Sequence, residues 1–127
     1  MAGLKGKRIL VVEDEALIAV MVEDMLAELG SVVVGPAAAI NDALALVQTE
    51  AIDAAVLDVN VRGERIDPVA HALFERGIPV LFATGYSEIP IASLQQADVI
   101  NKPYTQEKLA RGLARGMGIA ALDDPAK

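Results

Sequence analysis

The sequence predicts an α/β protein, a doubly wound three-layer sandwich with helices on both faces of one parallel sheet. Short β-branched apolar runs alternate along the chain with longer segments whose apolar residues recur every three or four positions. The continuous apolar run at 8–12 is also typical of a strand buried on both faces of such a sheet. Five runs of this kind suit a (βα)5, flavodoxin-like strand order 2-1-3-4-5, which opens a crevice at the carboxyl ends of the first and third strands.

The strands are expected where the apolar runs are short and bounded by turn residues. The second run is expected to stop at Gly35-Pro36, because proline cannot donate to a strand ladder. The predicted strands cover residues 8–12, 32–34, 54–57, 79–83 and 98–100.

The helices are expected between these strands, from their apolar spacing and their caps. The first helix is expected to carry an apolar face and to end at Gly30, since apolar residues recur every three or four positions at Leu17, Ile18, Met21, Val22, Met25, Leu26 and Leu29. A second helix is expected over 38–48. Asp67 is expected to cap a third helix that ends at Gly77, and Thr105 is expected to cap the last. The segment 86–96 has few strong helix formers, so the fourth helix is expected to be short or labile.

Composition excludes several classes of protein. The chain has 127 residues, with 11 Lys and Arg against 18 Asp and Glu, and a formal net charge of −7. This acidity argues against a nucleic-acid binder, and the absence of Cys excludes disulfides and thiolate metal sites. No apolar run approaches the length of a membrane span. We expect a cytoplasmic protein with no nucleic-acid or membrane partner, folded over 1–120 with a flexible tail over 121–127.

Reactive side chains follow four of the five predicted strands. Glu13-Asp14, Asp58, Thr84 and Lys102 stand at these ends, where doubly wound folds gather their chemistry. Three converging carboxylates repel one another, and a divalent cation removes that cost. All-oxygen ligands suit Mg²⁺, and a metal beside a hydroxyl and an ammonium can stabilise a phosphoryl group. An Asp carboxylate can itself be the nucleophile in such a site.

These residues resemble the receiver domain of two-component response regulators, over nearly the whole chain. The matching stretches are Ile9-Leu10-Val11-Val12-Glu13-Asp14-Glu15, Val56-Leu57-Asp58-Val59-Asn60, Phe82-Ala83-Thr84-Gly85-Tyr86 and Asn101-Lys102-Pro103-Tyr104. The stretch 82–86 further resembles the FAT GUY subgroup of single-domain receivers, which HWE or related histidine kinases often serve.

The resemblance implies a role for each residue at the strand ends. Asp58 is the phosphoacceptor, and it binds Mg²⁺ together with Asp14, with Glu13 through water and with the backbone carbonyl of Asn60. Thr84 contacts the phosphoryl group and moves when it arrives. Lys102 pairs with a phosphoryl oxygen.

Three further residues follow from the resemblance. A cis bond before Pro103 would aim the neighbouring Lys. Gly85 would keep the pocket open. Most receivers carry an aromatic switch residue three positions before the Lys, where this chain has Val99, and Tyr86 is the candidate replacement.

The function predicted from this resemblance is a stand-alone switch rather than a turnover enzyme. A histidine kinase would supply the phosphoryl group, and a downstream protein or a phosphotransfer protein would read the result, with the chain as a monomer or weak dimer. Two alternatives stay open, a Mg²⁺-dependent phosphohydrolase with an aspartyl-phosphate intermediate and a degenerate receiver that binds partners without phosphorylation. His71 and the loop 62–65 are expected to be solvated surface.

Overall fold

The computed structural model describes residues 2–84 and 98–119. The expected fourth helix within 86–96, Gly85, Tyr86 and the tail over 121–127 lie outside the described residues. Within the described part, no helix is long and apolar enough to cross a membrane.

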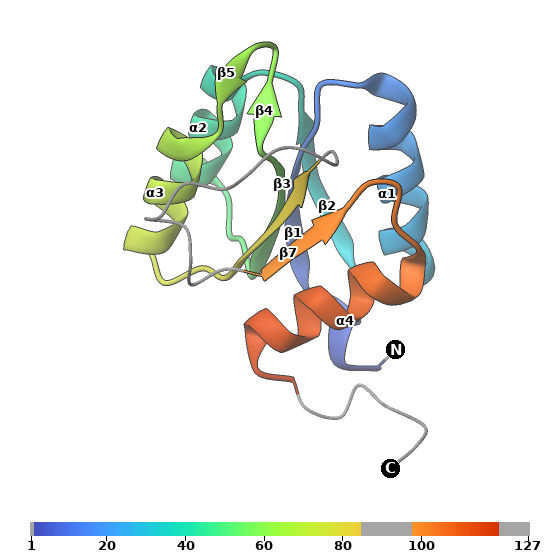
Figure 1. Cartoon of the computed structure of the whole chain (residues 1–127). Coiled ribbons are helices and arrows are strands. Elements are labelled where there is room, and N and C mark those ends of the chain that lie inside the picture. The colour runs from blue at the N-terminus through green and yellow to red at the C-terminus, as the bar shows by residue number, and fades with distance from the viewer. Residues whose placement is uncertain (1, 85–97, 120–127) are drawn as a thin grey trace.

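A five-stranded parallel sheet forms the centre of the molecule (Figure 1). The sheet order is β2-β1-β3-β6-β7, so the five long strands follow the predicted order 2-1-3-4-5. The strands are β1 (Arg8–Val12), β2 (Val32–Ala37), β3 (Ala54–Asp58), β6 (Val80–Thr84) and β7 (Asp98–Asn101).

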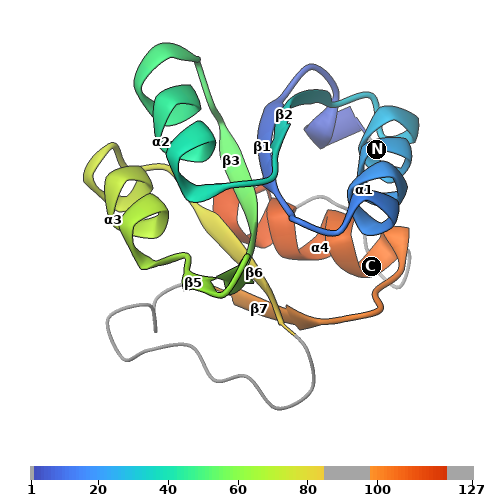
Figure 2. The same ribbon diagram turned by 90° about the horizontal axis from the view of Figure 1, so that it is seen from above.

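Helices cover both faces of this sheet and confirm the three-layer prediction (Figure 2). On one face α2 (Ile40–Thr49) and α3 (Asp67–Glu75) pack over strand residues such as Leu10 and Phe82. On the other face α1 (Ala16–Glu28) and α4 (Gln106–Met117) pack over Ile9 and Leu81. Successive strand residues point to opposite faces, so each strand contributes to both cores. A short 3-10 turn, η1 (Ala2–Leu4), precedes β1.

The caps of the helices agree with the sequence in one case and differ in another. Thr105 caps α4, because its Oγ1 accepts a hydrogen bond of 3.1 Å from the backbone N–H of Lys108. Asp67 does not cap α3. The helix begins at Asp67 itself after Ile66, and the Asp67 carboxylate lies 3.5 Å from the Arg65 guanidinium instead.

Two expectations about apolar segments are wrong. The second strand does not stop at Gly35-Pro36 but runs through this cis peptide to Ala37, which an edge strand tolerates because its outer side needs no ladder bonds. Leu17 and Met21 do not face the core, since they are 75% and 45% exposed. The helix α1 is apolar on more than one face, so spacing alone did not single out the stripe that packs.

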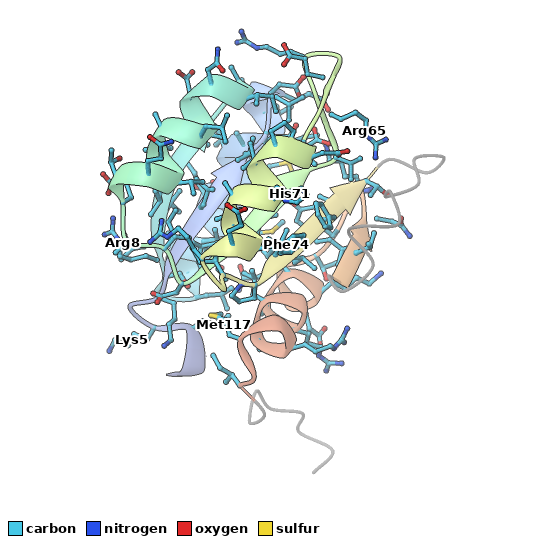
Figure 3. The ribbon with its side chains drawn as sticks, turned by 90° about the vertical axis from the view of Figure 1, so that its left-hand side faces the viewer. Lys5, Arg8, Arg65, His71, Phe74 and Met117 are labelled. Atoms are coloured by element: carbon cyan, nitrogen blue, oxygen red, sulfur yellow. The ribbon has the colours of Figure 1, made fainter. Side chains whose placement is uncertain are left out.

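A β-hairpin occupies the segment where the sequence predicted a solvated loop. Strands β4 (Asn60–Val61) and β5 (Glu64–Arg65) pair antiparallel directly after β3. The hairpin lies at the carboxyl end of the sheet, at the top of Figure 1. Figure 3 shows Arg65 on the hairpin and His71 on α3, and both side chains are exposed, as expected for His71.

Candidate functional site

The carboxyl ends of four strands bring the predicted site residues to one edge of the sheet. Glu13 and Asp14 follow β1, Asp58 ends β3, and Thr84 ends β6. The strand register aligns Val12 with Leu57, Asp58 with Ala83, and Thr84 with Asn101, directly before Lys102. Residues far apart in the chain therefore meet because parallel strands end on the same side.

Three carboxylates form the centre of this edge. One oxygen each from Glu13, Asp14 and Asp58 lies within 4.8 Å of the other two. Glu13 and Asp58 are buried, and Asp14 is half-buried. A compact set of hard oxygen donors fits Mg²⁺ by its chemistry, and Asn60 stands two residues after Asp58 at the start of β4.

The ammonium of Lys102 bridges two of the acids. Its Nζ lies 2.9 Å from Oε1 of Glu13 and 3.0 Å from Oδ2 of Asp58. Its backbone N–H donates to the carbonyl of Thr84 at 2.8 Å, and its peptide bond to Pro103 is cis. Burial alone lowers the pKa of Lys102, but the hydrogen bonds to Glu13 and Asp58 outweigh that effect and raise it above its ordinary value.

One ammonium does not neutralise the acids around it. Burial raises the pKa of Glu13 to about 7, and the nearby charge of Asp58 adds to this effect. Two hydrogen bonds to the Glu13 carboxylate lower its pKa, but by less than burial raises it. One comes from Lys102, and the other comes from the backbone N–H of Glu15, which lies 3.1 Å from Oε2. Burial in the pocket thus disfavours the ionised form of Glu13.

Of the proposed switch residues, the structure describes Thr84, which ends β6, and Val99, which lies on β7. Thr84 is buried, and its Oγ1 lies 3.3 Å from Oδ1 of Asn101 on the neighbouring strand. Val99, two residues before Asn101, is 44% exposed. Tyr86 is outside the described residues, so its proposed part in the switch stays a prediction.

Sequence reasoning assigned no role to three contributors to the site. Asn101 accepts a hydrogen bond from Thr84, and only the strand register of the structure shows that these two residues lie opposite each other. Tyr104 is buried next to the cluster, and burial raises the pKa of its phenol to about 12, with Glu13 the next cause. Arg62 donates its backbone N–H to Oδ2 of Asp14 at 2.8 Å, a contact that no side-chain pattern signals.

Comparisons with known proteins agree with this architecture. A sequence profile described as "Response regulator receiver domain" matches residues 9–114. No curated protein matches the chain. Among solved structures, SdrG from Sphingomonas melonis Fr1 is 46% identical, with a TM-score of 0.78, over 86% of this chain and 94% of that one.

Two further structures are similar over most of this chain. The BeF3-activated conformation of SdrG from Pseudomonas melonis Fr1 is 45% identical, with a TM-score of 0.74, over 87% of this chain and 95% of that one. The response regulator PhyR from Brucella abortus is 28% identical, with a TM-score of 0.74, over 89% of this chain and 48% of that one. The receiver-domain profile matches residues 9–114, and SdrG is 46% identical in sequence over 86% of this chain. The chain therefore belongs to the family of response regulator receiver domains.

Proposed function

We propose that this chain is a phosphorylation-controlled signalling switch whose phosphoacceptor is Asp58. The observation that carries the proposal is the placement of Lys102 between Glu13 and Asp58, at 2.9 and 3.0 Å, beside a third carboxylate. Receiver domains are signalling domains, and a buried carboxylate that faces an ammonium and a cation site is suited to accept a phosphoryl group.

In the proposed reaction an Asp58 oxygen attacks the phosphorus of a kinase phosphohistidine. The P–N bond breaks, and the imidazole nitrogen leaves with the electron pair. Glu13, Asp14 and Asp58, with the backbone carbonyl of Asn60, would hold Mg²⁺, which supplies positive charge for the phosphoryl oxygens. Lys102 then exchanges its contact with the Asp58 carboxylate for a phosphoryl oxygen.

Thr84 would carry the signal away from the phosphorylated site. Its hydroxyl, now 3.3 Å from Asn101, would turn to the phosphoryl group and release the neighbouring strand. Phosphorylation adds about −1.5 to −2 charges and new acceptor oxygens, which bias an equilibrium between two conformations. Because Val99 stands where most receivers have an aromatic ring, Tyr86 is proposed as the residue that reports the movement.

The proposed partners are proteins of a two-component pathway in the cytoplasm. A histidine kinase, of the HWE or a related type if the FAT GUY resemblance holds, would donate the phosphoryl group. A downstream protein or a phosphotransfer protein would read the switched surface. The relatives SdrG and PhyR support this reading, since one is described in a BeF3-activated conformation and the other as a response regulator.

Intact-mass measurement tests the proposal. The chain is incubated with Mg²⁺ and acetyl phosphate, alongside Asp58→Asn. A single phosphoryl adduct on the wild type that is absent from Asp58→Asn supports the switch. No adduct favours a degenerate receiver, an adduct on Asp58→Asn overturns the site, and sustained release of phosphate over many turnovers favours the phosphohydrolase.

A further inference from the structure

The tip of the β4–β5 hairpin is a two-residue turn of unusual composition. Arg62 and Gly63 connect the strands with φ of 53° and 78°, the left-handed pair typical of a type I′ hairpin turn. Asn, Asp and Gly are the residues that such turns favour at the first position. Within residues 2–84 and 98–119, Arg62 is the one non-glycine residue with a positive φ.

The base of the hairpin is fixed in the hydrophobic core. Val59, Val61 and Ile66 are fully buried and belong to the cluster under α2 and α3. The N–H of Ile66 also donates to the carbonyl of Val59 at 3.0 Å, which closes the base of the ribbon. The tip is exposed, so its position is determined by this anchored base and by what the tip contacts.

The tip contacts Asp14. The backbone N–H of Arg62 donates to Oδ2 of Asp14 at 2.8 Å, across 48 positions of sequence. A hydrogen bond to a carboxylate is among the stronger ones that a backbone amide makes. It occupies one carboxylate oxygen and restricts the rotation of the side chain, while one oxygen of Asp14 lies within 4.8 Å of oxygens from Glu13 and Asp58.

We propose that the hairpin tip is a positioning element for the cation site, in which the Arg62 amide holds Asp14 in its ligating orientation. Partners that orient a ligand without touching the cation contribute strongly to metal affinity. Strained backbone persists where surrounding contacts over-determine it, and here the contact is with a member of the acidic cluster. The inference rests on the proposed function for the identity of the cation, Mg²⁺.

The chain offers a matched pair of glycines for the test. Gly63 and Gly77 both have a positive φ, 78° and 72°, and an added Cβ would meet nothing within 4 Å at either. Valine at either position therefore strains the backbone in the same way. Gly63 shares the turn with Arg62, whereas Gly77 follows the carboxyl end of α3.

The measurement is the Kd for Mg²⁺ of the unphosphorylated, full-length chain, by titration of amide NMR shifts. Gly63→Val is expected to weaken binding about tenfold or more, and Gly77→Val is expected to bind like the wild type. Arg62→Asn keeps the N–H and suits the turn, so it is expected to retain binding. Equal affinities for Gly63→Val and Gly77→Val overturn the inference, as does a loss in Arg62→Asn as large as that in Gly63→Val.

A second measurement tests the inference even if Gly63→Val does not fold. Hydrogen exchange of the Arg62 amide is compared in metal-free wild type and Asp14→Ala. Exchange is expected to be slow in the wild type and at least tenfold faster in Asp14→Ala, and equal rates overturn the inference. A wild type that binds no Mg²⁺ contradicts the proposed function instead, because the exchange comparison needs no metal.

Discussion

The ammonium of Lys102 lies 3.0 Å from Oδ2 of Asp58, 44 residues away in the chain. The same nitrogen lies 2.9 Å from Oε1 of Glu13. One ammonium therefore forms ion pairs with two buried carboxylates that the sheet brings together. The charge of this pocket can therefore be changed by substitution of Lys102 or Glu13, or by addition of a metal ion.

Removal of the Lys102 charge should destabilise the metal-free fold. Lys102→Met keeps most of the apolar stem but leaves Glu13 and Asp58 without their shared counter-charge. We expect a loss of about 2 kcal/mol in the free energy of unfolding, measured with urea in the presence of a chelator. Mg²⁺ should restore most of it. Lys108→Met, at an exposed position of α4, serves as the control, and equal stability of the two variants contradicts the prediction.

The contribution of Glu13 to the metal-free stability should fall as the pH rises through its titration. Its pKa is raised from 4.5 to about 7, so the folded state binds more protons than the unfolded state between these values. Stability is then lost progressively from about pH 4.5 to pH 7, and Glu13→Gln should remove this contribution. Urea unfolding at several pH values checks it: the advantage of Glu13→Gln over the wild type should grow from pH 5 to pH 8, whereas parallel curves argue against it.

Mg²⁺ should stabilise the fold through the acidic cluster. A ligand that binds only the folded state stabilises it by about 2.7 kcal/mol at 100 times its Kd. Thermal unfolding with and without Mg²⁺ should show the increase in the wild type, and a chelator should reverse it. Asp14→Asn should lose it, while Asp24→Asn, at an exposed position of α1, should not. An undiminished effect in Asp14→Asn would falsify the assignment of Asp14.

Thr84 should link the occupied site to the neighbouring strand. Thr84→Val removes the hydroxyl that contacts Asn101 and preserves the shape of the side chain. When beryllium fluoride and Mg²⁺ are added, the amide NMR shifts of β7 should be much smaller in Thr84→Val than in the wild type. Thr84→Ser retains a hydroxyl and should respond like the wild type. If Thr84→Val responds fully, the signal leaves the site by another route.

Much of this fold was predictable because its sheet is buried on both faces. The runs that form β1, β3 and β6 are apolar nearly throughout, and their reactive residues begin where the strands end. The hairpin was not predictable in the same way. Its turn has Arg62 at a position that usually takes Asn, Asp or Gly, so the local signal was missing.

The contact between Arg62 and Asp14 was beyond sequence reasoning for a related reason. The donor is a backbone N–H, which every residue except proline has. The contact therefore does not require a particular side chain at position 62. The orientation of α1 was also hidden, because the exposed Leu17 and the buried Val22 belong to one continuous apolar pattern. Where burial depends on tertiary packing rather than on periodicity, the spacing of apolar residues is insufficient.

Pro36 has a consequence for the behaviour of this protein at high concentration. The strand β2 is an edge of the sheet, and an open edge can pair with the edge of another chain and start aggregation. Pro36 is the fifth of the six residues of this strand and has no N–H, so a regular ladder with a second chain would be interrupted near the carboxyl end of β2. Pro36 therefore limits the regular part of this edge that a second chain could pair with to residues 32–35.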